Sequence, residues 1–459
     1  MQLLGTLDRF QGELIRPGDV AYDQARRLWN GAIDRHPALI ARCSDPADAA
    51  VALAHAQEIQ APVTVRGGGH NVGGWALADG AVAIDFSNMR RVRVDALRRR
   101  VRVQPGALWG DFDAATQPLG LGAPAGIVTH TGVAGLTLGG GFGWLSRRFG
   151  LVSDNLTAAD LVLASGECVR ATEASHRDLF WAIRGGGGNF GIVTEFEFQL
   201  HAMRTQVLAG PILHTADRAR EVLRFYRDFI DGAPDELSVY VNLRTAPAVE
   251  WMPAQLHGKP VVMLVPCYSG DDLGAGERLL RPLRAFGPPS ADLVQDKPYL
   301  AHQAMFDAAV PHGWSYYWKS HYLPPLTDAA IDVLAEHAWQ KKSPASYTLV
   351  FHLGGQIARL PGDHSAASGR VVAHAVNISA AWTEDGPAHP DIEWCRAAFR
   401  ALQPHSTGGV YMNFLHNDEG EARVRAAYGN HYERLVGIKA RYDPHNIFHG
   451  NQNIRPVAG

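Results

Sequence analysis

Three glycine-rich segments lie within the first 200 residues, and they constrain the fold of this chain more than any other feature. The first, Gly67 to His70, follows the β-forming residues Val63 to Val65, so we expect a short buried strand that runs into a loop. Glycine has no Cβ, so its backbone adopts positive φ readily and its N–H groups can approach a ligand closely. Successive N–H groups in such a turn form a concavity that binds anions. The other segments are Gly139 to Gly143 and Gly185 to Gly188, and together the three predict a long, phosphate-bearing cofactor.

Length, charge and cysteine usage narrow the class of protein. A chain of 459 residues is longer than one hydrophobic core normally supports, so we expect two domains. The net charge is only −3, which argues against a nucleic-acid partner or a polybasic membrane surface. The N-terminal segment lacks the features of a secretory signal, and no apolar run is long enough for a transmembrane helix. The four cysteines, Cys43, Cys168, Cys267 and Cys395, form no CxxC pair. We interpret them as free thiols and expect a cytoplasmic protein. We expect this protein to be a monomer or a small homo-oligomer.

The character of the sequence changes near residues 205–215. Before that point, short strand-like segments surround the glycine-rich loops. After it, amphipathic helical segments alternate with strand-like ones, which predicts a second, α+β domain with an antiparallel sheet covered by helices. The helical segments are residues 216–229 and 328–339, and the strand-like segments are residues 237–243, 261–268, 347–353 and 371–382. A C-terminal helix is expected over residues 421–441.

One glycine pattern imitates a Rossmann dinucleotide site. Gly186, Gly188 and Gly191 fit GxGxxG, but a helix-like segment precedes them and a β-rich segment follows. The Rossmann fingerprint requires the opposite order, so we reject that interpretation. The chain also lacks a P-loop motif and a paired-cysteine or HExxH ligand set, and no metal site is expected.

Four segments carry a resemblance to a known family. They read Arg-Gly-Gly-Gly-His-Asn at 66–71, Gly-Val-Ala-Gly-Leu-Thr-Leu-Gly-Gly-Gly-Phe-Gly at 132–143, a glycine-rich run at 178–194 and Tyr-Asp-Pro-His-Asn-Ile-Phe at 442–448. In this order they resemble the berberine-bridge-enzyme-like FAD oxidases of the vanillyl-alcohol oxidase superfamily. The bacterial members similar to 6-hydroxy-D-nicotine oxidase are the nearest in character. The resemblance covers nearly the whole chain.

The resemblance implies an α+β fold with a PCMH-type FAD-binding domain of two subdomains at residues 1–205. It further implies a substrate domain with an antiparallel sheet covered by helices at 206–412, and a C-terminal segment, 413–459, that returns to the FAD-binding domain. FAD would be bonded covalently to His70 through its 8α-methyl carbon. Many relatives have a second link through a cysteine, where this chain has Val128, so a single link is expected.

The resemblance also implies which residues contact FAD. They are Arg66, Gly67, Gly68, Gly69, His70, Asn71, Thr131, Gly132, Gly135, Gly139, Gly140, Gly141, Gly143, Gly191, Ile192, Val193 and Asn451. Thr131 occupies a position that influences oxygen access in the family, and its compact side chain favours an oxidase over a dehydrogenase.

The base of the family mechanism is not carried over. The segment 410–414 resembles the family's Tyr-x-Asn-Tyr strand near the flavin and contains Tyr411 and Asn413, but its last residue is Phe414, which cannot take a proton. Tyr411 or His352 are the alternative bases, and each could equally be a packed strand residue. An amine substrate would need no strong base.

These residues predict an FAD-dependent oxidase that takes hydride from an alcohol, a hemiacetal or an amine, with oxygen as acceptor and hydrogen peroxide as product. The alternatives are a flavin dehydrogenase or flavin-oxygenating enzyme of secondary metabolism, and a non-catalytic flavin-containing protein that binds a drug. Aromatic residues of the second domain suit a ring-bearing small molecule, although at least half of them should be core residues. They are Tyr240, Tyr268, Trp314, Tyr316, Tyr317, Trp318, Tyr347 and Trp382.

Overall fold

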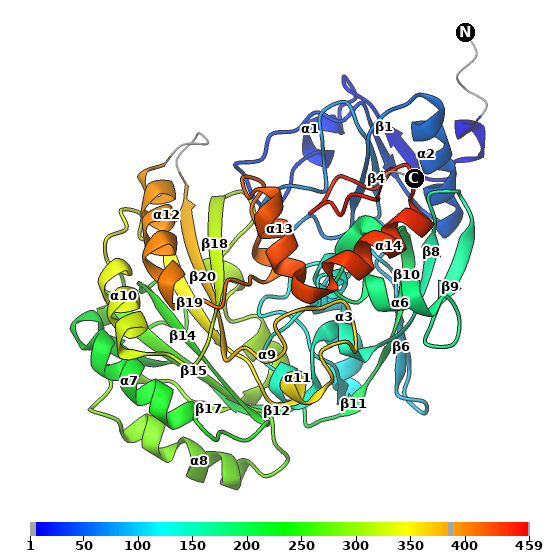
Figure 1. Ribbon diagram of the computed structural model, residues 1–459. Helices are drawn as coiled ribbons and strands as arrows, with labels where there is room; N and C mark the ends of the chain where they lie inside the picture. Colours follow the sequence, from blue (N-terminus) through cyan, green and yellow to red (C-terminus); the bar gives the residue numbers. More distant parts are fainter. Residues whose placement is uncertain (1–5, 384–388, 458–459) are drawn as a thin grey trace.

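The elements of the chain gather in two parts that lie side by side (Figure 1). The structure is a computed structural model, and it describes residues 6–383 and 389–457. One part holds the N-terminal elements together with the C-terminal helices, and the other holds the large sheet of the middle of the chain (Figure 1). Helices and largely antiparallel sheets share the fold, which confirms the expected α+β class.

The first glycine loop extends from a small, mostly parallel sheet. Its strands run in the order β1 (Glu13–Ile15), β2 (Leu39–Arg42), β4 (Val82–Asp85) and β3 (Val63–Arg66), and β3 ends where the loop begins. The crossover helix α2 (Pro46–Glu58) begins at Asp45, whose carboxylate accepts the Ala47 N–H, with proline at its first position. The capping carboxylate and the proline therefore set the start of this helix through local contacts.

A second sheet supports the remaining glycine segments. It is antiparallel, with the order β5 (Val92–Asp95), β6 (Arg100–Val103), β10 (Ile192–Gln199), β8 (Leu156–Val162) and β9 (Cys168–Ala171). Helix α6 (Arg177–Ile183) precedes the third glycine segment and β10 follows it, so the helix-then-strand order read from the sequence is confirmed.

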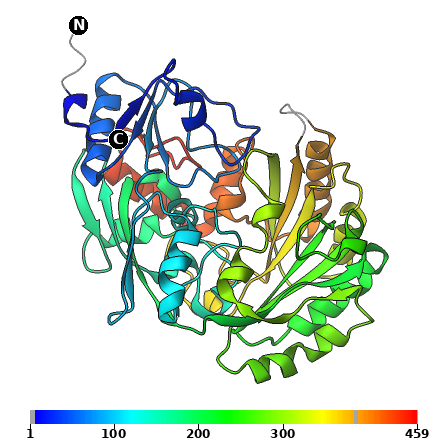
Figure 2. The same ribbon diagram turned by 180° about the vertical axis from the view of Figure 1, so that it is seen from behind.

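The C-terminal helices pack into the hydrophobic core of this second sheet. Both views show them in red against the first part of the molecule (Figure 1 and Figure 2). The single helix expected over 421–441 is wrong: α13 (Glu421–Tyr428) and α14 (Tyr432–Tyr442) are separate helices. Gly429, with φ of 54°, interrupts them because a regular helix does not continue through that conformation.

The nine-stranded sheet of the second part is covered by helices on one face and packs against the first part of the molecule with the other. Its main order is β16-β13-β15-β14-β19-β20-β18, and its longest strands are β14 (Leu237–Thr245), β15 (Pro260–Tyr268), β18 (Ser315–Leu323), β19 (Tyr347–His352) and β20 (His374–Trp382). Helices α7 (Ala219–Ile230), α8 (Leu273–Ala285), α10 (Asp328–His337) and α12 (Pro390–Leu402) cover the outer face (Figure 1). The inner face packs toward the first part of the molecule.

Shorter elements complete the described chain. They are α1 (Tyr22–Ala25), α3 (Trp109–Thr116), β7 (Leu121–Gly122), α4 (Val133–Leu138), α5 (Ser146–Phe149), β11 (His201–Ala202), β12 (Gln206–Ala209), β13 (Ile212–Thr215), β16 (Ala291–Asp292), β17 (Gln295–Pro298), α9 (Tyr299–Gln303) and α11 (Gln356–Arg359). Within residues 6–383 and 389–457, no helix combines the length and the apolar character needed to span a bilayer.

The segment 410–414 is a turn, and its interpretation as a strand is wrong. Met412–Phe414 form one turn of 3-10 helix, in which the Phe414 N–H donates to the Tyr411 carbonyl at 3.0 Å. The hydroxyl of Tyr411 is held by the N–H of Gly141, which is far away in sequence. The alternation of residue types within 410–414 therefore does not determine the conformation of this segment.

A buried lysine ties the C-terminal segment to the third glycine segment. Lys439 Nζ donates to the carboxylate of Asp443 at 2.7 Å and to the carbonyls of Asn189 at 2.8 Å and Phe448 at 2.9 Å. The other Asp443 contacts are the N–H groups of Ile447 and Phe448. Both charged side chains are fully buried. The hydrogen bonds named above compensate for the loss of water around the two charges.

We expect Lys439→Met to lower the free energy of unfolding by about 3–5 kcal/mol, because it leaves the Asp443 carboxylate buried without its partner. The measurement is the urea-induced unfolding transition followed by tryptophan fluorescence. Lys259→Met, at an exposed position, is the control and should change nothing. The double variant Lys439→Met/Asp443→Leu should recover part of the loss; a single variant as stable as the wild type would contradict the assigned role.

Candidate functional site

A large cavity lies between the two parts of the molecule. It encloses about 1950 Å³ of space between protein atoms, including its open mouth. The first glycine loop, the segment from Gly126 to Leu138, the inner face of the large sheet and the segment from Phe448 to Gln452 all line it. A cavity with walls from so many distant segments suits a long ligand that is gripped along its length.

Two glycines that are far apart in sequence, Gly68 and Gly132, meet backbone to backbone at the cavity wall. A Cβ on Gly68 would lie 2.5 Å from the Gly132 Cα, and a Cβ on Gly132 would lie 2.6 Å from the Gly68 nitrogen. No other residue type fits at either position without a shift of the backbone. At Gly135, by contrast, a Cβ would meet no protein atom within 4 Å, and this glycine lines the cavity. The space above Gly135 is therefore cavity, available to a ligand.

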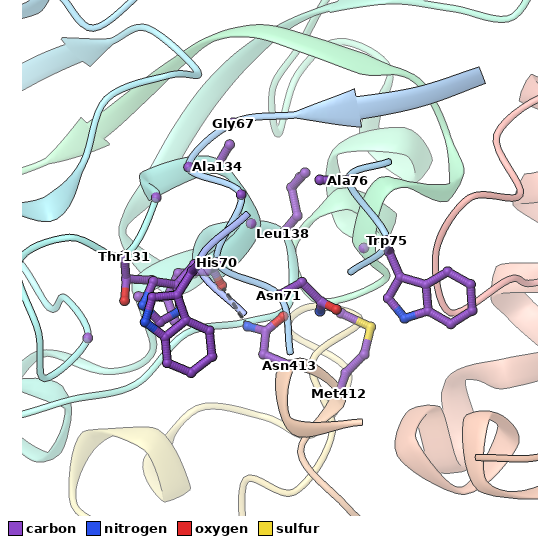
Figure 3. A pocket seen from close by; sticks show the side chains of 18 of the residues that line it. Gly67, His70, Asn71, Trp75, Ala76, Thr131, Ala134, Leu138, Met412 and Asn413 are labelled. Carbon is purple, nitrogen blue, oxygen red and sulfur yellow. Dashed lines mark hydrogen bonds between the residues drawn. The ribbon is translucent and has the colours of Figure 1, made fainter. Parts of the chain in front are cut away.

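The side chain of His70 is held from two sides. Its Nε2 lies 3.0 Å from His130 Nδ1, and its ring stacks on Trp29 with centroids 4.2 Å apart. Trp29 in turn stacks on Tyr316 of the large sheet at 3.8 Å. Figure 3 shows His70 and Thr131 on one side of the group of lining side chains, Asn71 and Asn413 in the middle, and Trp75 on the other side.

The environment of His70 keeps its imidazole neutral. Burial, together with the neighbouring His130 and His312, holds the pKa of His70 well below its ordinary value. His130 is the side-chain partner of Nε2, and the imidazole is also hydrogen-bonded to the backbone of its own residue. A neutral imidazole keeps a nitrogen lone pair and can act as a nucleophile or a ligand, which the protonated form cannot.

Most of the residues predicted to contact a cofactor lie together at this cavity. They are Gly67, Gly68, Gly69, His70, Asn71, Thr131, Gly132, Gly135, Gly191, Ile192, Val193 and Asn451, and Tyr411 and Asn413 join them. The others lie behind the wall: Arg66, Gly139, Gly140, Gly141, Gly143 and His352. Arg66 donates to the Ala25 carbonyl and so holds the loop from outside the cavity.

The second glycine segment supports the wall from behind. A Cβ on Gly139 would lie 2.1 Å from the side-chain oxygen of Asn413, and a Cβ on Gly143 would lie 2.2 Å from the Ala125 carbonyl. The Gly141 N–H donates to the hydroxyl oxygen of Tyr411 at 3.1 Å. These glycines permit close packing against the residues that do line the cavity.

Tyr411 is not poised to take a proton. Its hydroxyl oxygen accepts hydrogen bonds from the Gly141 N–H and, at 2.8 Å, from Asn413 Nδ2. Burial raises the pKa of Tyr411, so the phenol stays protonated. Its ring packs with Phe142 and Phe414 and forms part of the cavity wall.

His352 points away from the cavity. Residues alternate across β19, so Leu349 and Phe351 line the cavity and His352 lies on the opposite face. Its Nε2 lies 3.1 Å from Arg147 Nη1, and burial and the Arg147 charge hold the pKa of His352 well below its ordinary value. The structure therefore does not bring this predicted base to the other site residues.

Sequence patterns did not single out several lining residues: Trp29, Asn242, Arg244 and Asn377. The two asparagines and the arginine lie on strands, in which alternate residues point to the same face of the sheet. The sequence does not say which face of these strands points into the cavity, so their polar residues could not be assigned to it. Of the eight aromatic residues considered, only Trp318 and Tyr347 line the cavity within the described chain. Tyr268, Tyr317 and Trp382 pack in the outer core, which agrees with the expectation that most are core residues.

Comparison with known proteins identifies two matching family regions. The FAD binding domain family matches residues 37–172, and the berberine and berberine-like family matches residues 410–455. An FAD-linked oxidoreductase from Dictyostelium discoideum is 30% identical over 455 residues, which are 98% of this chain and 96% of that protein. The (R)-6-hydroxynicotine oxidase of Paenarthrobacter nicotinovorans is 30% identical over 475 residues, 99% and 98% of the two chains.

Solved structures share the whole architecture. The structure of 6-hydroxy-D-nicotine oxidase from Arthrobacter nicotinovorans superposes with a TM-score of 0.86 at 27% identity, over 97% of this chain and 98% of that chain. Glucooligosaccharide oxidase from Acremonium strictum, which contains a 6-S-cysteinyl, 8α-N1-histidyl FAD, gives 0.88 at 22% identity over all of both chains. The fold of the chain is thus that of the PCMH-type FAD oxidases.

We expect Gly135→Ala to weaken FAD binding by roughly tenfold, because a methyl group added to an occupied space costs on the order of 1–3 kcal/mol. The measurement is the titration of FAD into flavin-free protein in which His70 is replaced by alanine, so that no covalent link retains the cofactor. The unfolding midpoint of flavin-free protein should not fall, since no protein atom lies near the new methyl group and alanine favours the helix. Gly362→Ala, also in open space but outside the cavity lining, is the control; an unchanged FAD affinity in Gly135→Ala would show that the cofactor lies elsewhere.

Proposed function

The chain belongs to the berberine-bridge-enzyme-like family of FAD-linked oxidoreductases, and from this membership we propose that it is an oxidase of a small, ring-bearing substrate. The substrate gives hydride to FAD, and molecular oxygen takes the electrons and leaves as hydrogen peroxide. The observation that carries this proposal is the single cavity that joins the glycine loops and His70 to the aromatic inner face of the large sheet.

The residues at the cavity fit FAD. Residues 67–71 and 131–135 would hold it on one wall, where Gly135 leaves space, and residues 191–193 and Asn451 would hold it on another. In this proposal residues 1–205 and 413–459 bind the cofactor and residues 206–412 bind the substrate. Bound FAD supplies the hydride acceptor, while the protein supplies orientation and electrostatics.

We place a single covalent link to FAD at His70. Its imidazole is held neutral by burial, its Nε2 lies 3.0 Å from His130 Nδ1, and the residue lines the cavity. The histidyl link of the Acremonium strictum enzyme supports the same type of bond here. Val128 lines the cavity and has no thiol, so no second link forms there.

An amine is the substrate that suits this cavity best among the alcohol, the hemiacetal and the amine. The described lining residues include no aspartate, glutamate or lysine, Tyr411 is held protonated, and the one lining histidine is His70. A neutral amine passes hydride without prior removal of a proton by a strong base, so it needs none of these groups. The ring of the substrate would lie against Trp318, Phe351 and Phe414, whose rings meet at 5.5–5.6 Å.

We expect the wild-type protein to remain yellow when it is precipitated in acid, because FAD bonded to His70 stays with the chain. His70→Ala should give a colourless pellet and a yellow supernatant. Cys168→Ser removes the exposed thiol and should leave the pellet yellow. Release of all FAD from the wild-type protein would contradict the covalent link.

The role of oxygen has its own test. After anaerobic reduction with dithionite, the protein should be reoxidised rapidly when it is mixed with oxygenated buffer in a stopped-flow instrument. Thr131 is small and lines the cavity, so Thr131→Leu should slow this step by obstructing access. Sluggish reoxidation of the wild-type protein would indicate a dehydrogenase with a different electron acceptor.

A further inference from the structure

One buried arginine lacks the partners that the others have. Four arginines are buried in the described chain, and three of them are well paired. Arg370 binds the Asp154 carboxylate through two nitrogens, Arg184 pairs with Glu173 at 2.6 Å, and Arg147 donates to several backbone carbonyls. The fourth is Arg244, and the one hydrogen bond of its side chain within residues 6–383 and 389–457 is from Nε to the Thr245 carbonyl at 3.3 Å.

The surroundings of Arg244 make this lack of a partner costly. The residue is only 3% exposed, and the described chain places no carboxylate within ion-pair distance of it. Its guanidinium lies 5.4 Å from the centre of the Tyr347 ring. Burial and the charge of Arg244 lower the pKa of Lys341 to about 7, against the opposite effect of Asp391. A buried cation without an anion is unfavourable, so this end of the sheet attracts an anionic group.

Arg244 faces the cavity in a row of unpaired polar groups. The strand register pairs Arg244 with Tyr347, and it pairs Asn242 with Leu349, which pairs with Asn377. These five residues all line the cavity from adjacent strands β14, β19 and β20 (Figure 1). The side-chain oxygens of Asn242 and Asn377 are enclosed and have no hydrogen-bond partner among the described residues.

Unpaired groups at a cavity wall indicate the chemistry of its ligand. The planar guanidinium of arginine matches the two oxygens of a carboxylate. The enclosed asparagine oxygens need donors, such as the N–H of an amine or the O–H of an alcohol. The wall opposite the glycine loops therefore presents both a site for an anion and sites for a hydrogen-bond donor.

We propose that the substrate carries a carboxylate and that Arg244 binds it. This inference rests on the function proposed above and names the class of its substrate: a ring-bearing amine or alcohol with a carboxylate group. Arg244 fixes the carboxylate at the sheet, and Asn242 and Asn377 accept hydrogen bonds from the donor group of the same molecule. Arg244 is thus a residue that determines specificity.

The test compares two probes of nearly the same shape, the anion phenylacetate and the neutral phenylacetamide, whose N–H groups can also donate to Asn242 and Asn377. Each is titrated into oxidised holoenzyme, and binding is followed by the change in flavin absorbance. The wild-type protein should bind phenylacetate at least about tenfold more tightly, the range expected for a hydrogen-bonded charge pair. Arg244→Met should lose this preference, and Arg244→Lys should keep part of it. Arg220→Gln, an exposed arginine of α7 that pairs with Asp332, should keep all of it.

A second readout reports on folding. Because Arg244→Met removes an unpaired buried charge, the variant should unfold at a temperature no lower than that of the wild type, and phenylacetate should stabilise only the wild type. Equal affinity for the two probes in the wild type, or an unchanged preference in Arg244→Met, would overturn the proposal. A lower fraction of protein with covalently attached flavin in Arg244→Met would also overturn it, since Arg244 would then pair with the cofactor. None of these measurements requires turnover of a substrate. Failure of the Arg244 proposal can therefore be distinguished from failure of the proposed oxidase activity.

Discussion

A backbone contact between two glycines, Gly68 and Gly132, is the constraint on which the candidate site depends. Because neither residue has a Cβ, two loops separated by more than sixty residues close into one wall. The second loop is itself fixed by the start of α3, where the Trp109 N–H donates to the Thr131 carbonyl at 3.0 Å. This wall places His70 beside His130 and leaves the space above Gly135 open. A side chain at either contact would separate the loops and disperse the site.

The two parts of the molecule contribute different chemistry to one cavity. The glycine loops offer backbone and a neutral histidine, which suits a large cofactor and its covalent attachment. The large sheet offers aromatic rings, two amides and the cation of Arg244, which suits a small ring-bearing molecule with a negative charge. The stack of His70, Trp29 and Tyr316 joins the two parts directly. Retention of the cofactor and choice of substrate can therefore vary independently.

Local sequence patterns predicted the elements that local interactions determine. The strand β3 and its glycine loop and the apolar strands β14, β15 and β19 were all expected. Contacts between residues that are distant in sequence were not predicted. The turn at 410–414 depends on a hydrogen bond from Gly141 to Tyr411, and His130 acquires its significance only from its contact with His70. Arg244 could not be assigned because the inward face of a strand is known only once the sheet has paired.

The covalent bond between FAD and His70 is the central claim, and peptide mapping tests it most directly. Trypsin cleaves after Arg66 and Arg90 and releases one peptide, residues 67–90, that contains this histidine. Mass spectrometry should find that peptide with the added mass of a flavin and with the modification at His70, and it should find every cysteine-containing peptide without one. An unmodified 67–90 peptide as the sole product, or a flavin attached to a cysteine, would contradict the account.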